Sequence, residues 1–234
     1  MKLFYIARPE DETMVLDENE SKHLVRVLRL KQGDTIEAVD GEGGWYRGVI
    51  ADAHVKHCRI GELRLLRRED PIPYHLHLAV APTKQMDRME WMLEKATELG
   101  VSEITPLLCM HSERKTIKPE RLEKILVSAM KQSLRAYKPR LNPLREFRDF
   151  LMEPRGGQKW IAHCFPGKRS DISSIPGSAS YTFLIGPEGD FSEDELKQAM
   201  ASCYKPLLLG ESRLRTETAA IYVCASMRFR HALG

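Results

Sequence analysis

Short blocks of apolar residues separated by turn signals fill the first 70 residues, and this pattern predicts a small β-rich domain. Apolar, β-prone stretches lie at 2–7, 35–53 and 58–66, and the glycine-rich segment Gly41–Gly44 divides the second stretch into a hairpin. Strands this closely spaced are typical of a small barrel.

One helix interrupts these strands. Residues 19–34 open with a helix-capping signal, and Leu24, Val27 and Leu28 would share one helical face before Gly33 ends the helix. The same stretch carries basic residues.

From Tyr74 onward the pattern changes to alternating strands and helices. Strands are expected at 75–82, 103–109, 159–164, 181–186 and 205–210, and helices at 84–100, 118–136, 142–151, 192–203 and 215–233. This alternation predicts an α/β domain with a mostly parallel sheet and helices on both faces. The segment 67–74 holds two prolines and a charge run, so we expect domains at 1–70 and 74–234.

Charge is unevenly distributed. The 234 residues carry a net charge of only +3, yet 36 are Lys or Arg, and these gather at 22–31, 59–68 and 114–148. Basic clusters fit a polyanionic partner, although solvated helix faces are the alternative for each cluster. The candidate RNA contacts are Lys22, Arg26, Arg29 and Lys31.

The five cysteines are scattered and form no CxxC pair, which indicates a reducing compartment rather than a disulfide framework. The histidines in "HVKHC" (54–58) and in "HLH" (75–77) lack further ligands at suitable spacing, so no metal is expected. No apolar run approaches the roughly 20 residues needed to span a bilayer, and the N-terminus lacks a signal-peptide pattern. We therefore expect a cytoplasmic protein without membrane contact.

Two glycine loops point to a ligand site. Gly186–Gly189 and Gly210 each follow an expected strand, and ligands in α/β sheets bind beyond the carboxyl ends of the strands. Glycine allows backbone to approach a ligand closely. No phosphate-binding Gly-Lys-Ser/Thr loop, dinucleotide GxGxxG or hydrolase GxSxG is present, which disfavours those classes.

These loops also carry a resemblance to a known family. "IGPEGDFSEDEL" (185–196) and "LGESRLRTETAA" (209–220) resemble the paired C-terminal motifs of the RsmE family, the bacterial 16S ribosomal RNA uridine-N3 methyltransferases of the SPOUT superfamily. "HLVRVLRLKQGD" (23–34), "EKATELGVSEITPL" (94–107) and "KQSLRAYKPRLNP" (131–143) resemble further motifs of that family, in order along the chain. Asp190 and Arg213 depart from it, since Gly and an apolar residue are usual there.

The resemblance implies a PUA-like N-terminal β-barrel and a C-terminal SPOUT domain whose sheet contains a deep trefoil knot. It further implies a homodimer that uses S-adenosylmethionine to methylate N3 of a specific uridine in the decoding region of 16S rRNA, on the small ribosomal subunit. The implied cofactor-binding residues are Leu184, Ile185, Gly186, Pro187, Glu188, Gly189, Leu209, Gly210, Leu214 and Thr218.

Catalysis at uracil N3 needs a group that removes or compensates the N3 proton. Glu217 and Glu188 are candidate bases, Arg215 could stabilise the uracil anion, and Arg135 resembles a family site residue. Charge compensation at a helix N-terminus is the alternative role for Glu217. Two rival functions stay open: an RNA-binding protein without activity, and a SPOUT enzyme that acts on tRNA.

Overall fold

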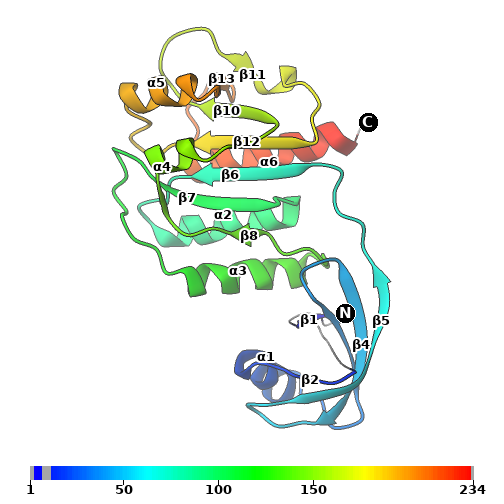
Figure 1. The fold of residues 1–234 in the computed structure, drawn as a ribbon. Coiled ribbons are helices and arrows are strands. Elements are labelled where there is room, and N and C mark those ends of the chain that lie inside the picture. The colour runs from blue at the N-terminus through cyan, green and yellow to red at the C-terminus, as the bar shows by residue number, and fades with distance from the viewer. Residues whose placement is uncertain (1–2, 7–11, 233–234) are drawn as a thin grey trace. The chain divides into compact units, whose positions relative to one another are not determined.

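The computed structural model describes residues 3–6 and 12–232, which fall into two compact units (Figure 1). The first unit comprises Met1–Pro71 and Val127–Lys138, and the second comprises Ile72–Leu126 and Pro139–Gly234. The chain thus leaves the first unit within the proline-containing segment expected to join the domains. Val127–Lys138 groups with the first unit, although the sequence analysis placed it with residues 74–234.

The first unit is built on a five-stranded sheet. Its strands are β1 (Leu3–Tyr5), β2 (Met14–Val15), β3 (Thr35–Val39), β4 (Gly44–Asp52) and β5 (Arg59–Arg68), in the order β1-β3-β4-β5-β2. The expected hairpin at Gly41–Gly44 is confirmed, because β3 and β4 pair antiparallel across it. Three register shifts interrupt the β4–β5 ladder, and such irregularities increase the bend and twist of a sheet.

The returning segment Val127–Lys138 completes this unit. Met130 and Ala136 are buried in a cluster with Trp45, and the Tyr137 hydroxyl donates a hydrogen bond to the Glu69 carbonyl oxygen at 3.0 Å. The segment therefore supplies core residues to the unit as well as polar contacts.

The helix expected over 19–34 is shorter and less regular than predicted. It consists of α1 (Glu18–Lys22) followed by a π-helical turn, His23–Val27, in which the Leu28 amide bonds the His23 carbonyl at 3.0 Å. A π-turn inserts an extra residue and rotates the positions that follow it. Leu24 is consequently buried, but Val27 is 66% exposed, so the expected apolar face was wrong at Val27.

The second unit contains a larger, parallel sheet. Its strands are β6 (His75–Val80), β7 (Glu103–Leu108), β8 (Arg140–Leu141), β9 (Arg145–Glu146), β10 (Gln158–Ala162), β11 (Ser170–Asp171), β12 (Ser180–Ile185) and β13 (Lys205–Leu208). The order is β11-β13-β10-β12-β6-β7-β8, with β9 paired to β7, and every pairing is parallel. The expected parallel α/β sheet is confirmed.

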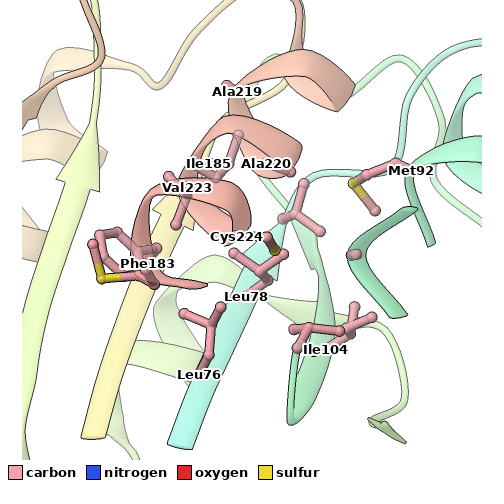
Figure 2. Close-up of a cluster of buried hydrophobic side chains, with 14 of the residues drawn as sticks. Leu76, Leu78, Met92, Ile104, Phe183, Ile185, Ala219, Ala220, Val223 and Cys224 are labelled. Atoms are coloured by element: carbon pink, nitrogen blue, oxygen red, sulfur yellow. The ribbon is translucent and has the colours of Figure 1, made fainter. Parts of the chain in front are cut away.

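Helices cover both faces of this sheet. They are α2 (Met86–Leu99), the first part of α3 (Pro119–Gln132), α4 (Phe147–Met152), α5 (Glu193–Ala201) and α6 (Thr216–Ala232). The rest of α3, from Val127, belongs to the first unit. Alternate residues of β6 serve the two faces: Leu76 and Leu78 pack with α2 and α6, whereas Ala79 packs with α4 and α5. Figure 2 shows Val223 and Cys224 of α6 packed over β6 and β12.

One helix is shorter than expected, and the final helix is only partly covered. The helix expected at 118–136 ends at Gln132, and Leu134 then adopts a positive φ of 54°. Helix α6 buries one side, including Ala220 and Val223, and leaves Tyr222 and Phe229 exposed. Most of its apolar residues are thus covered within the chain.

Candidate active site

A cavity of about 1020 Å³ lies at the carboxyl ends of three neighbouring strands, β13, β10 and β12. Three segments line it, 162–166, 185–190 and 207–216, together with Arg169 and Ala219. Each segment begins at the end of one strand, which is where α/β sheets bind ligands. The two glycine loops singled out in the sequence therefore do form one site.

The Gly-Pro-Glu-Gly loop is fixed from several sides. The Thr216 hydroxyl donates to the Gly186 carbonyl at 2.9 Å, which ties the start of α6 to the end of β12. Glu188 accepts the Lys84 backbone N–H at 2.9 Å. Ser192 and Glu195 form a capping box at the start of α5, so the loop ends in a stable helix.

Asp190 is accommodated by its side-chain contacts. Its φ is +64°, a conformation in which glycine is easiest and Asp and Asn are the next most tolerated residues. The two carboxylate oxygens accept the backbone N–H groups of Cys164 and Phe191, each at 2.8 Å. The departure from the family pattern is therefore compatible with the loop's positive φ and provides a contact to the neighbouring segment.

The second glycine loop is open. Gly210 has a φ of +111°, and a Cβ atom built there would meet no heavy atom within 4 Å. Any side chain at Gly210 would be strained by its backbone conformation, independently of a ligand. A substitution at Gly210 thus needs a control with the same strain.

Both signs of charge surround the cavity. Arg169, Arg213 and Arg215 line it, and so do the carboxylates of Glu188 and Asp190. Arg169 Nη1 donates to the His163 carbonyl at 2.7 Å, whereas Arg213 and Arg215 are exposed. A cavity with arginines and strand-end backbone suits a ligand that carries a carboxylate and hydrogen-bonding groups.

Most of the site residues expected from the sequence line this cavity, and four do not. The lining residues are Ile185, Gly186, Pro187, Glu188, Gly189, Leu209, Gly210, Leu214 and Arg215. Leu184 is buried in the sheet, Thr218 is exposed on α6, and Arg135 belongs to the first unit. Arg135 follows α3, where its amide donates to the Met130 carbonyl at 3.0 Å.

Glu217 is the fourth residue outside the lining. Its side chain is only 8% exposed, and its Oε1 lies 3.6 Å from Arg88 Nη1 of α2. No hydrogen-bond partner is found for its buried Oε2 among the residues that the structure describes. The carboxylate therefore sits at the start of α6 beside an arginine, a position that suits a positioning role as well as a chemical one.

One wall of the cavity, the segment 162–166, was not predicted from the sequence. His163 is buried, and neither ring nitrogen has a hydrogen-bond partner in the described part of the chain. Burial lowers the pKa of His163, so the ring is neutral near pH 7. No glycine marks this strand end, and only the strand order shows that β10 lies between β12 and β13.

The four candidate RNA contacts lie in the first unit and are exposed. Lys22 pairs with Glu18 at 2.6 Å, Arg26 is in the π-helical turn, and Arg29 follows it with a φ of +56°. Arg26 and Arg29 therefore do not share a regular helical face. Lys31 lies in the next turn, where its amide bonds Asp34 at 2.7 Å.

Within residues 3–6 and 12–232, no group of three or more His, Cys, Asp or Glu side chains could hold a metal ion. None of the helices in the same residues is long and apolar enough to cross a membrane.

Two family models match this chain, one in each of its two parts. A family model described as an RNA methyltransferase domain matches residues 70–228, and a model described as an RNA methyltransferase PUA domain matches residues 16–63. Ribosomal RNA small subunit methyltransferase E of Rickettsia conorii is 30% identical over 226 residues, which cover 94% of this chain and 91% of the relative. The Bacillus subtilis protein of the same name is 27% identical, over 96% of this chain and 93% of the relative.

Solved structures agree. A probable rRNA-methyltransferase from Porphyromonas gingivalis has a TM-score of 0.87 and 38% identity, covering 100% of this chain and 99% of that one. Ribosomal RNA small subunit methyltransferase E from Neisseria gonorrhoeae, bound to S-adenosyl methionine, has a TM-score of 0.87 and 25% identity, covering 98% of each chain. This chain therefore belongs to the ribosomal RNA small subunit methyltransferase E family, with an RNA methyltransferase domain that follows a PUA domain.

Proposed function

We propose that this protein transfers a methyl group from S-adenosylmethionine to N3 of a uridine in the decoding region of 16S rRNA, within the small ribosomal subunit. The observation that carries the proposal is the cavity formed by the ends of β10, β12 and β13. A family relative with 25% identity over 98% of the chain is described as bound to S-adenosyl methionine.

The residues around the cavity fit this donor. The volume of about 1020 Å³ lies at the upper end of the range for small-molecule sites, roughly 300–1,000 Å³. Ile185, Leu209 and Leu214 offer apolar surface for a nucleobase, and backbone groups of 186–189 offer hydrogen bonds. Arg169 and Arg213 are suited to the donor's carboxylate.

The donor, when bound, supplies an electrophilic methyl group on a sulfonium sulfur. The chain's own task is to make uracil N3 nucleophilic, because neutral N3 carries a proton. Arg215 lines the cavity and can stabilise negative charge on the uracil oxygens as that proton leaves. Arg135 is proposed to contact a phosphate of the RNA.

Glu188 and Glu217 are the proposed proton acceptors, and they differ in setting. Glu188 lines the cavity and already accepts the Lys84 amide, whereas Glu217 is buried beside Arg88. Glu188→Gln and Glu217→Gln should be measured in parallel under donor and RNA saturation. Substitution of the true proton acceptor should lower turnover at neutral pH. Turnover should then recover partly as the pH rises, because more of the uracil is already ionised.

Further features of the family resemblance are part of the same proposal: a trefoil knot in the second unit, a cytoplasmic location, and a homodimer. The exposed Tyr222 and Phe229 on α6, with the latter 67% exposed, offer apolar surface for a second copy. Light scattering at micromolar concentration should give about twice the chain mass of 26.8 kDa. A clean monomer would reject the dimer.

One experiment tests the function directly. The protein is incubated with methyl-labelled donor and either small ribosomal subunits, naked 16S rRNA or tRNA, and the modified nucleoside is mapped by mass spectrometry. We expect 3-methyluridine in 16S rRNA. Label in tRNA would favour the tRNA-modifying alternative, and donor binding or RNA binding without any transfer would favour a protein that only binds RNA.

Gly210→Val should weaken donor binding about 10-fold or more, because a branched side chain would occupy space beside the ligand. Gly33→Val is the matched control, since Gly33 also has a positive φ, +91°, with no heavy atom within 4 Å of a built Cβ. Both variants carry backbone strain, but only Gly210 lines the cavity. Titration calorimetry should show reduced donor affinity in Gly210→Val alone. Equal donor affinities in the two variants would show that Gly210 does not contact the donor.

The Arg88–Glu217 pair should matter for stability. Arg88→Gln leaves the carboxylate of Glu217 buried without its partner, whereas Glu217→Gln leaves a neutral amide beside an arginine that is 36% exposed. We expect Arg88→Gln to lower the free energy of unfolding by about 1–3 kcal/mol, more than Glu217→Gln does. Urea denaturation of both variants checks the order, and the reverse order would show that the ion pair does not compensate the buried charge.

A further inference from the structure

Asp190 connects two walls of the cavity that the sheet does not hold together. The parallel ladder between β10 and β12 ends at the pair Ala162–Ile185. Beyond it, the chain segments 163–166 and 186–190 continue as separate loops along the cavity. Asp190 Oδ2 accepts the Cys164 N–H at 2.8 Å, so this bond joins the loops just past the last pair of the ladder.

The remaining contacts of Asp190 fix its orientation. Its Oδ1 accepts the Phe191 N–H at 2.8 Å, and His111 Nδ1 lies 3.1 Å from the carbonyl oxygens of Gly189 and Asp190. The Phe191 ring is fully buried in the core, and its amide is therefore a fixed anchor. The carboxylate is thus held on one side by a rigid residue and on the other holds Cys164.

The wall that Asp190 holds carries a buried histidine and an exposed thiol. His163 is 8% exposed, and neither ring nitrogen is bonded within the described residues. Cys164 is exposed and lines the cavity with Asp190. A small displacement of this wall would therefore change the cavity itself rather than a remote surface.

We propose that Asp190 is a positioning residue for the methyl donor, which holds the 163–166 wall against the Gly-Pro-Glu-Gly loop before the ligand binds. The inference rests on the proposed function, because the cavity is taken as the donor site. A wall that is already in place does not have to be ordered on binding, and such preorganisation increases affinity. Because the wall does not supply the reacting groups, donor affinity should depend on Asp190 while turnover at saturation does not.

Two substitutions of Asp190 separate the hydrogen bond to Cys164 from the effects of charge and backbone strain. Asp190→Gly removes both carboxylate bonds without backbone strain, since glycine readily adopts a φ of +64°. Asp190→Asn keeps a side-chain oxygen that can accept the Cys164 amide, and Asn also tolerates a positive φ. Titration calorimetry with S-adenosylmethionine should show an affinity loss of roughly 5- to 30-fold for Gly, the loss expected from one or two hydrogen bonds, and rescue by Asn to within about 3-fold.

Alkylation of Cys164 provides a second readout, which can also be measured in the absence of the donor. Cys58, Cys109 and Cys224 are buried, so a Cys203→Ser background leaves Cys164 as the exposed thiol among the five cysteines. Its alkylation by N-ethylmaleimide is then followed with and without the donor. We expect saturating donor to slow alkylation, because Cys164 lines the cavity.

The pH dependence of alkylation must be included in the comparison. Burial raises the pKa of Cys164, and the negative charge of Asp190 raises it further because it disfavours the thiolate. Both Asp190 variants remove that charge and should lower the thiol pKa. The limiting rate at high pH, where the thiol is fully ionised, should rise only in Asp190→Gly, in which the wall is released.

Several outcomes would contradict the proposal that the hydrogen bond between Asp190 and Cys164 holds the wall in place. Wild-type affinity and a wild-type limiting alkylation rate in Asp190→Gly would overturn it, and so would an Asn variant as weak as Gly. A fall in turnover at saturation in Asp190→Gly would assign the residue to chemistry instead. If the wild-type protein bound no donor at all, the proposed function would fail, yet the donor-free alkylation rates would still test whether Asp190 holds the wall.

Discussion

Arg215→Met should lower the rate of methyl transfer about 10²–10³-fold at saturating donor and RNA, with little change in donor affinity. Arg215 follows the second glycine loop and lines the cavity within one residue of the start of α6. Its backbone is held in place because the next residue, Thr216, donates a 2.9 Å hydrogen bond to the Gly186 carbonyl. An oriented positive charge of this kind stabilises an anion that develops only as the uracil loses its proton.

Arg213→Met is the matched control for this variant. Arg213 lines the same cavity, is similarly exposed, and carries the same charge two residues earlier in the chain. If general positive charge around the cavity were enough, both variants would lose rate equally. We expect Arg213→Met to keep turnover within about 10-fold, and an equal or larger loss there would move the electrostatic role away from Arg215.

Removing Lys22, Arg26, Arg29 and Lys31 together should weaken RNA binding by roughly 10²-fold at low salt and reduce the slope of log affinity against log salt. Each lost phosphate contact on single-stranded RNA reduces that slope by about 0.7, because fewer counterions are released. Lys22 already pairs with Glu18 at 2.6 Å, so its share should be smaller than those of the other three. Filter binding over a salt series measures both quantities.

A second variant controls for net charge. Four exposed lysines of the second unit can be replaced instead: Lys118, Lys124, Lys168 and Lys197. This variant loses the same charge and should retain most of the salt slope, while donor affinity stays normal in both. Equal slopes in the two variants would show that the RNA does not depend on the residues near the π-helical turn.

Periodicity and turn chemistry predicted most of the fold, because each element has a local signal. The strand expected at 75–82 and the helix expected from Ser192 are present in the structure as β6 and α5. The π-helical turn was missed, since nothing in the sequence distinguishes Val27 from a buried helical position. A one-residue insertion in the hydrogen-bond pattern is a property of the packed chain.

The two glycine loops of the candidate site were predicted from the sequence. The third wall was missed, because its place in the site depends on the order of the strands in the sheet. Gly186 and Gly210 carry a local reason to lie near a ligand, but the wall at His163 depends on β10 lying between β12 and β13. The contact of Glu217 with Arg88 joins residues far apart in the sequence, and no spacing indicates it. The family resemblance assigned the two glycine loops to one site, because the family's paired motifs include both loops.

The return of Val127–Lys138 to the first unit has a consequence for the order in which the protein is made. One buried cluster of the first unit includes Met130 and Ala136, so residues 1–71 cannot complete that cluster when they leave the ribosome. At typical synthesis rates of about 5–20 residues per second, several seconds pass before that segment emerges. During this interval Leu3, Val39 and Trp45 lack Met130 and Ala136, and early docking of a chaperone at this partly formed cluster is the expected result.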